Sequence, residues 1–157
     1  LIGDKEEISK FYIFKNNTAA SIISNNEQFI NKYIKLNNLE IDEVQSLKQV
    51  NFDDVINVVP KNSLFWLFCQ GEEIGILNSS KILKQKSVIC FHYSPLINSK
   101  GSSQEELLVK NLNENNYKKI YDLKENHNVS KEISVNTFQN LNEKYKSNGS
   151  HTILTVI

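Results

Sequence analysis

The chain has 157 residues, a length that suits one domain with one hydrophobic core. Its 18 basic and 18 acidic residues balance, so it lacks the positive excess with which proteins hold nucleic acids or anionic membranes. No apolar run approaches the roughly 20 residues that span a bilayer. Residues 1–10 also lack the apolar centre of a signal peptide. We therefore expect neither a nucleic-acid partner nor a membrane partner.

Two absences concern the origin of the chain. Every basic residue is a lysine, and the sequence contains no methionine, not even at its first position. Since a nascent chain begins with Met, we expect residues 1–157 to form one domain from a processed or trimmed segment of a longer chain. Cys69 and Cys90 lie in apolar runs, which is typical of isolated buried thiols and unlike a disulfide-stapled secreted domain. We expect a cytoplasmic protein.

The first third of the chain predicts one strand and three helical pieces. The aromatic and β-branched run at residues 11–14 is typical of a strand. A Ser-x-x-Glu capping box followed by apolar residues at helical spacing predicts a helix over residues 24–38. A second capping pattern predicts another helix that begins at Asp42. Asn51 then caps a short piece that stops at Pro60.

The middle of the chain predicts an antiparallel group of strands. Residues 64–69 form the most apolar run, and its length and aromatic content favour a central strand with Trp66 in the core. Residues 70–73 predict a turn whose two glutamates are solvated. Ile74–Leu77 then predicts the return strand of a hairpin. Another strand is predicted over Ser87–Tyr93.

The last third predicts two helices that alternate with two strands. A helix with leucines on its apolar face follows Gly101. Residues 117–123 predict a short extended segment, and residues 125–130 predict a polar loop. A last helix carries apolar residues on one face up to Tyr145, and residues 151–157 predict a final strand.

The predicted order is therefore β-α-α-β-β-β-α-β-α-β. Strands and helices are mixed, and the antiparallel group lies in the middle. We expect an α/β fold of the α+β mixed type, in which helices flank a central, mostly antiparallel sheet.

The segment Val88–Leu108 offers the most definite chemical suggestion. A buried strand, a polar loop and the start of a helix are predicted here, and this order often builds a phosphate site. Backbone N–H groups from Ser99 to Ser103 would supply donors, and Lys100 would add a positive charge. The alternative is that the serines form a capping box with Glu105 and Glu106, whose charges would repel a phosphate that they faced.

The element order and this segment resemble the GNAT superfamily of acyl-CoA-dependent N-acyltransferases. The family's acyl-CoA motif follows its fourth strand and reads roughly P-x-x-[RQ]-x-x-G-x-[GA]. After Pro95, this chain places Asn98 at the Arg/Gln position, Gly101 at the first Gly position and Ser103 at the second. Asn98 and Ser103 depart from the pattern. Since the chain has no arginine, anion binding would depend on backbone donors.

The resemblance implies acetyl-CoA or another acyl-CoA as co-substrate and a small-molecule or peptide amine as acceptor. It implies that the fourth and fifth strands, Val88–Tyr93 and Lys119–Leu123, splay apart around the pantetheine arm. The candidate cofactor-binding residues are Tyr93, Asn98, Ser99, Lys100, Gly101, Ser102 and Ser103.

Two residues are candidates for acid–base catalysis. The family's acid is a Tyr in its last helix, and Tyr145 lies near the end of a similar but out-of-register motif. His92 lies on the key strand, where alternation places it with Cys90 and opposite Tyr93, and it is the candidate base. The alternatives are a tyrosine packed on the core and a hydrogen-bonded, half-buried histidine. The three histidines are too scattered to predict a metal site.

Two functions follow from these observations. The first is an acyl-CoA-dependent N-acyltransferase that moves an acyl group from CoA to an amine. The second is a non-catalytic protein-interaction module, for example a toxin-neutralising protein of the immunity type. The poor match in the last helix, the missing arginine and the lack of a convincing base favour the second.

Overall fold

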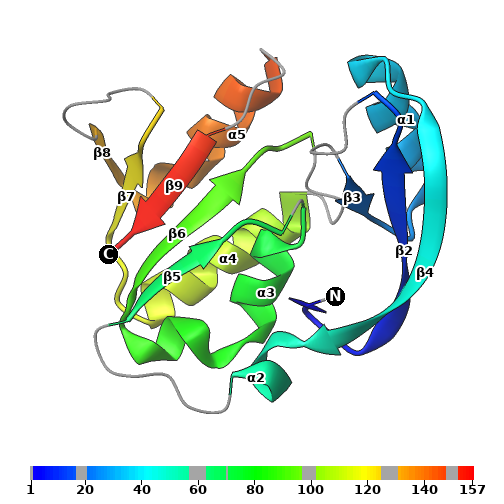
Figure 1. Cartoon of the computed structure of the whole chain (residues 1–157). Coiled ribbons are helices and arrows are strands. Elements are labelled where there is room, and N and C mark those ends of the chain that lie inside the picture. The colour runs from blue at the N-terminus through cyan, green and yellow to red at the C-terminus, as the bar shows by residue number, and fades with distance from the viewer. Residues whose placement is uncertain are drawn as a thin grey trace.

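The computed structural model describes residues 2–16, 21–56, 63–69, 71–96, 102–124, 131–147 and 152–157. Within these residues the chain is a mixed α/β protein whose strands form two separate sheets (Figure 1). The mixed class is confirmed. Both sheets combine parallel and antiparallel pairs, where a central, mostly antiparallel sheet was expected.

The first sheet has the strand order β1-β4-β2-β3. Its strands are β1 (Ile2–Gly3), β2 (Glu7–Phe14), β3 (Ile22–Ile23) and β4 (Ile41–Asn51). Helix α1 (Glu27–Asn37) packs on it and encloses a small core with Tyr12, Phe14, Ile22, Ile30 and Tyr33. The side chain of Asn26 accepts from the Phe29 N–H and caps α1, and the left-handed Asn38 ends it.

The second sheet has the strand order β5-β6-β9-β7-β8. Its strands are β5 (Leu64–Leu67), β6 (Val88–Tyr93), β7 (Lys119–Asp122), β8 (Lys131–Ser134) and β9 (Thr152–Val156). β5 pairs with β6 in parallel, whereas β9 is antiparallel to both β6 and β7. The described helices of this half are α2 (Phe52–Val55), α3 (Glu73–Ser79), α4 (Ser102–Glu114) and α5 (Phe138–Ser147), with 3₁₀ turns at Lys81–Gln85 and Val135–Thr137.

The larger core lies between one face of the second sheet and the helices α3, α4 and α5. Figure 1 shows α4 and α5 behind the ribbons of β6 and β9. Alternate strand residues enter this core together with helix residues, among them Ile89, Phe91, Leu108, Phe138 and Leu154. The other face of the sheet therefore points away from these helices.

Several predicted elements are confirmed. A strand contains residues 11–14, a helix follows Asn26, and β6, β7, β9, α4 and α5 lie where they were expected. Asn51 caps the short α2, as predicted. In α5, the expected inward face is buried at Phe138, Leu141 and Tyr145. The polar loop expected at residues 125–130 lies outside the described residues.

The helix predicted from Asp42 is wrong, because residues 41–51 form the long strand β4. Apolar residues at positions 41, 44, 47 and 50 are spaced as in a helix, but Ile41 and Val44 are exposed. β4 pairs with β2 from Glu7–Gln49 to Phe14–Ile41. This long antiparallel ladder overrides the local helical pattern.

The hairpin predicted from residues 64–77 is also wrong. Ile74–Leu77 belongs to helix α3, and β5 pairs in parallel with β6 and not with a return strand. β5 is an edge strand in which Phe65 and Leu67 are buried and Trp66 is 57% exposed, so Trp66 is not a core residue. Strand β8 was not predicted at all.

Two negative findings apply to the described part of the chain. None of its helices is both long and apolar enough to cross a bilayer. No group of three or more His, Cys, Asp or Glu side chains in these residues could hold a metal ion.

Candidate functional site

The structure places the predicted cofactor residues in two groups. Asn98, Ser99, Lys100 and Gly101 lie outside the described residues. Ser102 begins α4, Ser103 is exposed in its first turn, and Tyr93 ends β6. The strand before residues 97–101 and the helix after them are therefore as predicted.

The structure brings His92, Tyr93 and Tyr145 to the same edge of the second sheet, at the carboxyl end of β6. Tyr93 faces the helices, and its ring packs against Phe138 at 5.0 Å and against Tyr145 at 6.4 Å between centroids. His92 faces the opposite side, as strand alternation requires. The carboxyl ends of parallel strands are the usual position of ligand sites in α/β proteins.

Tyr145 binds a buried carboxylate. Its hydroxyl donates to Asp122 Oδ2 at 2.5 Å, and the Thr152 hydroxyl donates to Asp122 Oδ1 at 2.5 Å. The Lys124 backbone N–H and the Lys144 ammonium also approach Asp122, at 3.2 and 3.4 Å. Asp122 is fully buried and Tyr145 is 1% exposed.

These contacts shift both pKa values. Burial alone would raise the pKa of Asp122, but the hydrogen bonds from Thr152, Tyr145 and Lys124, with the charge of Lys144, lower it overall. Burial and the hydrogen bond to Asp122 raise the pKa of Tyr145. Tyr145 therefore holds its proton more firmly than a free tyrosine, which makes it a weaker acid than the predicted role requires.

Tyr93 makes a second contact with a carboxylate. Its hydroxyl donates to Glu105 Oε1 at 3.2 Å, and Asn142 Nδ2 donates to Glu105 Oε2 at 2.5 Å. Burial, then the charge of Glu105, raises the pKa of Tyr93. Glu105 is 3% exposed, and it links β6, α4 and α5. This is a structural contact, and it differs from the capping box considered as an alternative.

His92 lies beside a carboxylate that was expected to be solvated. Glu72 and Glu73 are 5% and 3% exposed, so the expectation of a solvated turn is wrong. Glu73 accepts from the backbone N–H groups of Cys69 at 2.6 Å and Gly71 at 2.8 Å. Its Oε1 lies 3.8 Å from His92 Nδ1.

His92 is 6% exposed, and the Phe68 ring packs on it at 4.7 Å between centroids. The histidine is therefore enclosed by its neighbours. The sequence does not predict the Glu73 contact, since residues 70–73 fit a hairpin turn. The signal available was the Gly-Glu-Glu sequence, which is compatible with the start of a helix.

Neither cysteine has the features of a nucleophile. Both are free, Cys90 is buried, and its Sγ lies 3.1 Å from Thr155 Oγ1. Burial, reinforced by the charge of Glu73, raises the pKa of Cys69 to about 11. A thiol with this pKa is protonated at neutral pH. The expectation of two isolated thiols is confirmed, although Cys69 is only partly buried.

The cleft expected between the fourth and fifth strands is not formed by those strands. β9 lies between β6 and β7 and pairs with both, through Tyr93–Thr152 on one side and Asp122–Leu154 on the other. The expectation that β6 and β7 are splayed neighbours is therefore wrong. β9 occupies the position where the pantetheine arm was expected.

A surface feature lies on the opposite face, over β5 and the start of β6. Leu64, Trp66, Phe68 and Val88 point to this side, and they are 62%, 57%, 52% and 37% exposed. Leu64 and Val88 are direct neighbours in the β5–β6 pair. These four residues do not belong to the larger core, and Figure 1 shows α4 and α5 behind the sheet. We refer to these four residues as the uncovered face.

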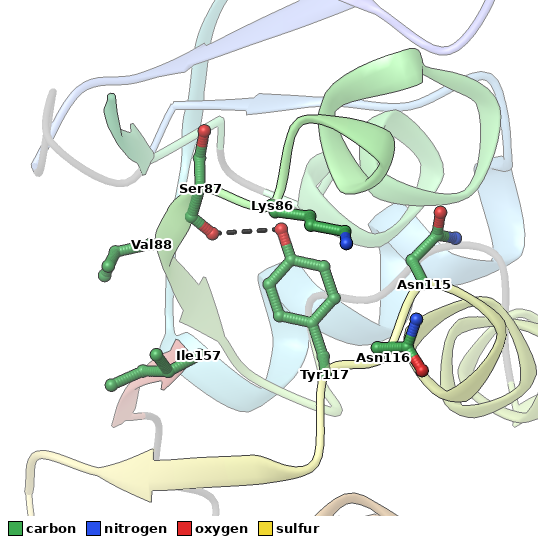
Figure 2. Close-up of a pocket in the computed structure, with 7 residues that line it drawn as sticks. All are labelled: Lys86, Ser87, Val88, Asn115, Asn116, Tyr117 and Ile157. Atoms are coloured by element: carbon green, nitrogen blue, oxygen red, sulfur yellow. Dashed lines mark hydrogen bonds between the residues drawn. The ribbon is translucent and has the colours of Figure 1, made fainter. Parts of the chain in front are cut away.

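A small hollow lies at the other end of the sheet, near the start of β6. Its volume is about 140 Å³, and it is lined by Lys86, Ser87, Val88, Asn115, Asn116, Tyr117 and Ile157. Figure 2 shows the Tyr117 ring between the apolar Val88 and Ile157 on one side and the polar Lys86 and Asn115 on the other. The Tyr117 hydroxyl donates to the Ser87 carbonyl at 2.9 Å, so it already has a partner.

A larger hollow of about 330 Å³ lies where the first sheet meets the start of α3. It is lined by Asp4, Lys5, Glu7, Ser9, Ile23, Ser24, Asn25, Asn26 and Glu72. Lys5 lies among three of these carboxylates. The hydrogen bond that its ammonium donates to Glu7, and then the charge of Glu7, raise the pKa of the lysine. The acidic groups are thus partly neutralised within the hollow.

No protein-family model matches the chain, and neither does any curated protein or solved structure. Two regions stand out. The polar groups at the carboxyl end of β6 bind one another and are buried, whereas the uncovered face presents large apolar side chains to solvent.

Proposed function

We propose that the chain is a non-catalytic protein-interaction module that binds a partner protein through the uncovered face. One observation carries this proposal: Leu64, Trp66 and Phe68 are each more than half exposed, and they alternate along β5 and the residue that follows it. Isolated exposed apolar residues are ordinary, but a contiguous group is typical of a binding surface. Trp is also among the residues that contribute most to binding energy at interfaces.

The state of the candidate catalytic groups supports the same proposal. Tyr93 and Tyr145 are 1% exposed and His92 is 6% exposed, so a substrate has little access to them. Each tyrosine hydroxyl donates to a buried carboxylate that belongs to another element. Such contacts hold helices against strands, which is a sufficient reason for these residue types at these positions.

A pull-down tests the proposal. We expect the wild-type chain to recover a stoichiometric partner protein from the source cells, and Trp66→Glu to reduce recovery more than tenfold, because a buried charge replaces an anchor worth about 2 kcal/mol or more. Leu36→Glu is the matched control. Leu36 is 59% exposed on α1, away from the uncovered face, so this change should leave recovery of the partner unchanged. Equal recovery by Trp66→Glu, or no partner at all, would contradict the proposal.

The second candidate function is the acyl-CoA-dependent N-acyltransferase, with acetyl-CoA or another acyl-CoA as co-substrate. The observation that favours it is the order of β6 and the 13-residue α4, whose first turn contacts the end of β6 through Glu105 and Tyr93. The N-terminus of a helix suits a phosphate group. Since β9 separates β6 from β7, the pantetheine arm would need a path outside that pair.

Calorimetry separates the two functions. An acyltransferase should bind acetyl-CoA with a dissociation constant below about 1 mM, and Lys100→Ala should weaken binding severalfold by removing one positive charge. Lys110→Ala, on the exposed side of α4, is the control. No heat of binding at millimolar acetyl-CoA would remove the acyltransferase and leave the interaction module.

A further inference from the structure

Two residues that line the small hollow at the start of β6 have backbone conformations that residues other than glycine rarely adopt. Lys86 ends the 3₁₀ turn before β6 with a φ of 52°, and Asn116 follows α4 with a φ of 66°. Asparagine is common in this left-handed conformation at a helix end, whereas lysine is strained there. Strained positions are found preferentially at functional sites, so the hollow beside Lys86 is a candidate ligand site.

The lining of the hollow has an apolar side and a polar side. Figure 2 shows Val88 and Ile157 on one side of the Tyr117 ring. It shows Lys86 and Asn116 on the other side. The Tyr117 ring is buried, and its hydroxyl is bonded to a backbone carbonyl, so the ring is held in place. A ligand that matches this lining has an apolar body and one polar end.

The polar side retains donors that the described part of the chain does not use. The Lys86 ammonium forms no ion pair with a described residue, whereas the nearby Lys110 pairs with Glu114. The Asn116 side-chain amide makes no hydrogen bond to a described residue either. An ammonium can only donate, and an amide nitrogen also donates. An anionic oxygen at this end of the hollow would therefore bind both groups.

Volume and charge limit the size and kind of this anion. The hollow measures about 140 Å³. An engineered cavity of about 150 Å³ in another protein holds one benzene molecule, so the apolar body is about one ring in size. Lys86 is the one charged side chain in the lining, which suits a singly charged carboxylate better than a doubly charged phosphate. Since Lys86 and Asn116 are exposed, the charged end of the ligand keeps its contact with water.

We infer that this hollow binds a small monocarboxylate whose apolar body is about the size of a benzene ring. The body lies against Tyr117, Val88 and Ile157. The carboxylate accepts from the Lys86 ammonium and the Asn116 amide. This site goes beyond the proposed function, because it takes a small acid and not a protein. A ligand of this size in an open hollow binds weakly, with a dissociation constant on the order of 1 mM.

An NMR titration with benzoate tests the site. Up to about 20 mM benzoate, the backbone amide signals of Lys86, Val88 and residues 115–117 should shift and saturate, because this range passes well above the expected dissociation constant. Benzyl alcohol has a similar apolar body without the charge and should bind about fivefold more weakly. Acetate has the charge without the body and should cause no saturable shift at these signals. Absence of saturable shifts with benzoate, or equal binding of benzyl alcohol, would overturn the inference.

Two substitutions test the polar side of the hollow. Lys86→Asn removes the charge and keeps a residue that tolerates the left-handed conformation, and it should weaken benzoate binding about fivefold. Asn116→Asp has nearly the same shape, tolerates the same conformation and places a negative charge beside the carboxylate. It should weaken binding about tenfold, because the two charges repel each other.

Each substitution has a control with the same change in net charge. Lys84→Asn lies on the exposed side of the 3₁₀ turn, and Asn140→Asp lies on the exposed side of α5. Both controls should bind benzoate as the wild type does, within about twofold. Circular dichroism should be the same for all four variants. If Lys86→Asn and Asn116→Asp stay folded and bind as tightly as their controls, the assigned polar contacts are wrong and the inference fails.

Discussion

Replacing Asp122 by alanine is expected to lower the free energy of unfolding by about 3–5 kcal/mol. The carboxylate is fully buried and accepts hydrogen bonds from Tyr145, Thr152 and the Lys124 backbone. Its removal leaves these donors without this acceptor and takes away the carboxylate that lies 3.4 Å from the Lys144 ammonium. Chemical denaturation at neutral pH measures the loss. Asp54→Ala, at an exposed position on α2, should change the free energy of unfolding by less than about 0.5 kcal/mol.

The contribution of Asp122 to the free energy of unfolding should also depend on pH. Because the folded chain lowers the pKa of Asp122 below its ordinary value of 3.8, the folded state favours the ionised carboxylate. The stabilisation is therefore complete well above pH 3.8 and is lost as the pH falls from this value through the lower pKa of the folded state. The difference in stability between wild type and Asp122→Asn should shrink over this acid range. A difference that stays constant from pH 7 to pH 2 would contradict the assigned contacts.

The parts of the fold that could be predicted are those where one local signal dominates. β6 is apolar apart from His92, and α5 repeats Phe138, Leu141 and Tyr145 at helical spacing, so predicting them did not depend on distant residues. β4 was missed because its apolar spacing fits a helix, and only pairing with β2 makes it a strand. α3 was missed because Ile74–Leu77 resembles a strand, although Glu73 closes the preceding turn and starts a helix.

Only part of the candidate site could be predicted, because its contacts also join residues that are distant in the sequence. His92, Tyr93 and Tyr145 could be selected as residue types, but their partners depend on the tertiary fold. Thr152 reaches Asp122 from 30 residues away, and Asn142 reaches Glu105 from 37 residues away. No local pattern reports such a contact. The same applies to the uncovered face, because a continuous apolar run is equally typical of a central strand and of an edge strand that binds a partner.

The second large effect is expected at Glu73, whose side chain connects the end of β5 to the start of α3. Its two oxygens accept from the Cys69 and Gly71 N–H groups, and it lies in the first turn of α3, where the helix dipole favours a negative charge. Glu73→Ala removes the acceptor of the buried Gly71 N–H and of the partly buried Cys69 N–H, and it removes a carboxylate beside His92. We expect a loss of about 3 kcal/mol in the free energy of unfolding.

The comparison with Glu73→Gln separates the geometry of this contact from its charge. Glutamine has one carbonyl oxygen, so it can satisfy one of the two N–H groups while its amide nitrogen opposes the other, and a loss of about 1–2 kcal/mol is expected. Denaturation curves of both variants measure these values. Loss of the hydrogen bonds from Cys69 and Gly71 should also let the end of β5 move. Glu73→Ala should therefore weaken binding at the uncovered face although it changes none of that face's side chains. Full binding by this variant would show that the turn does not position β5.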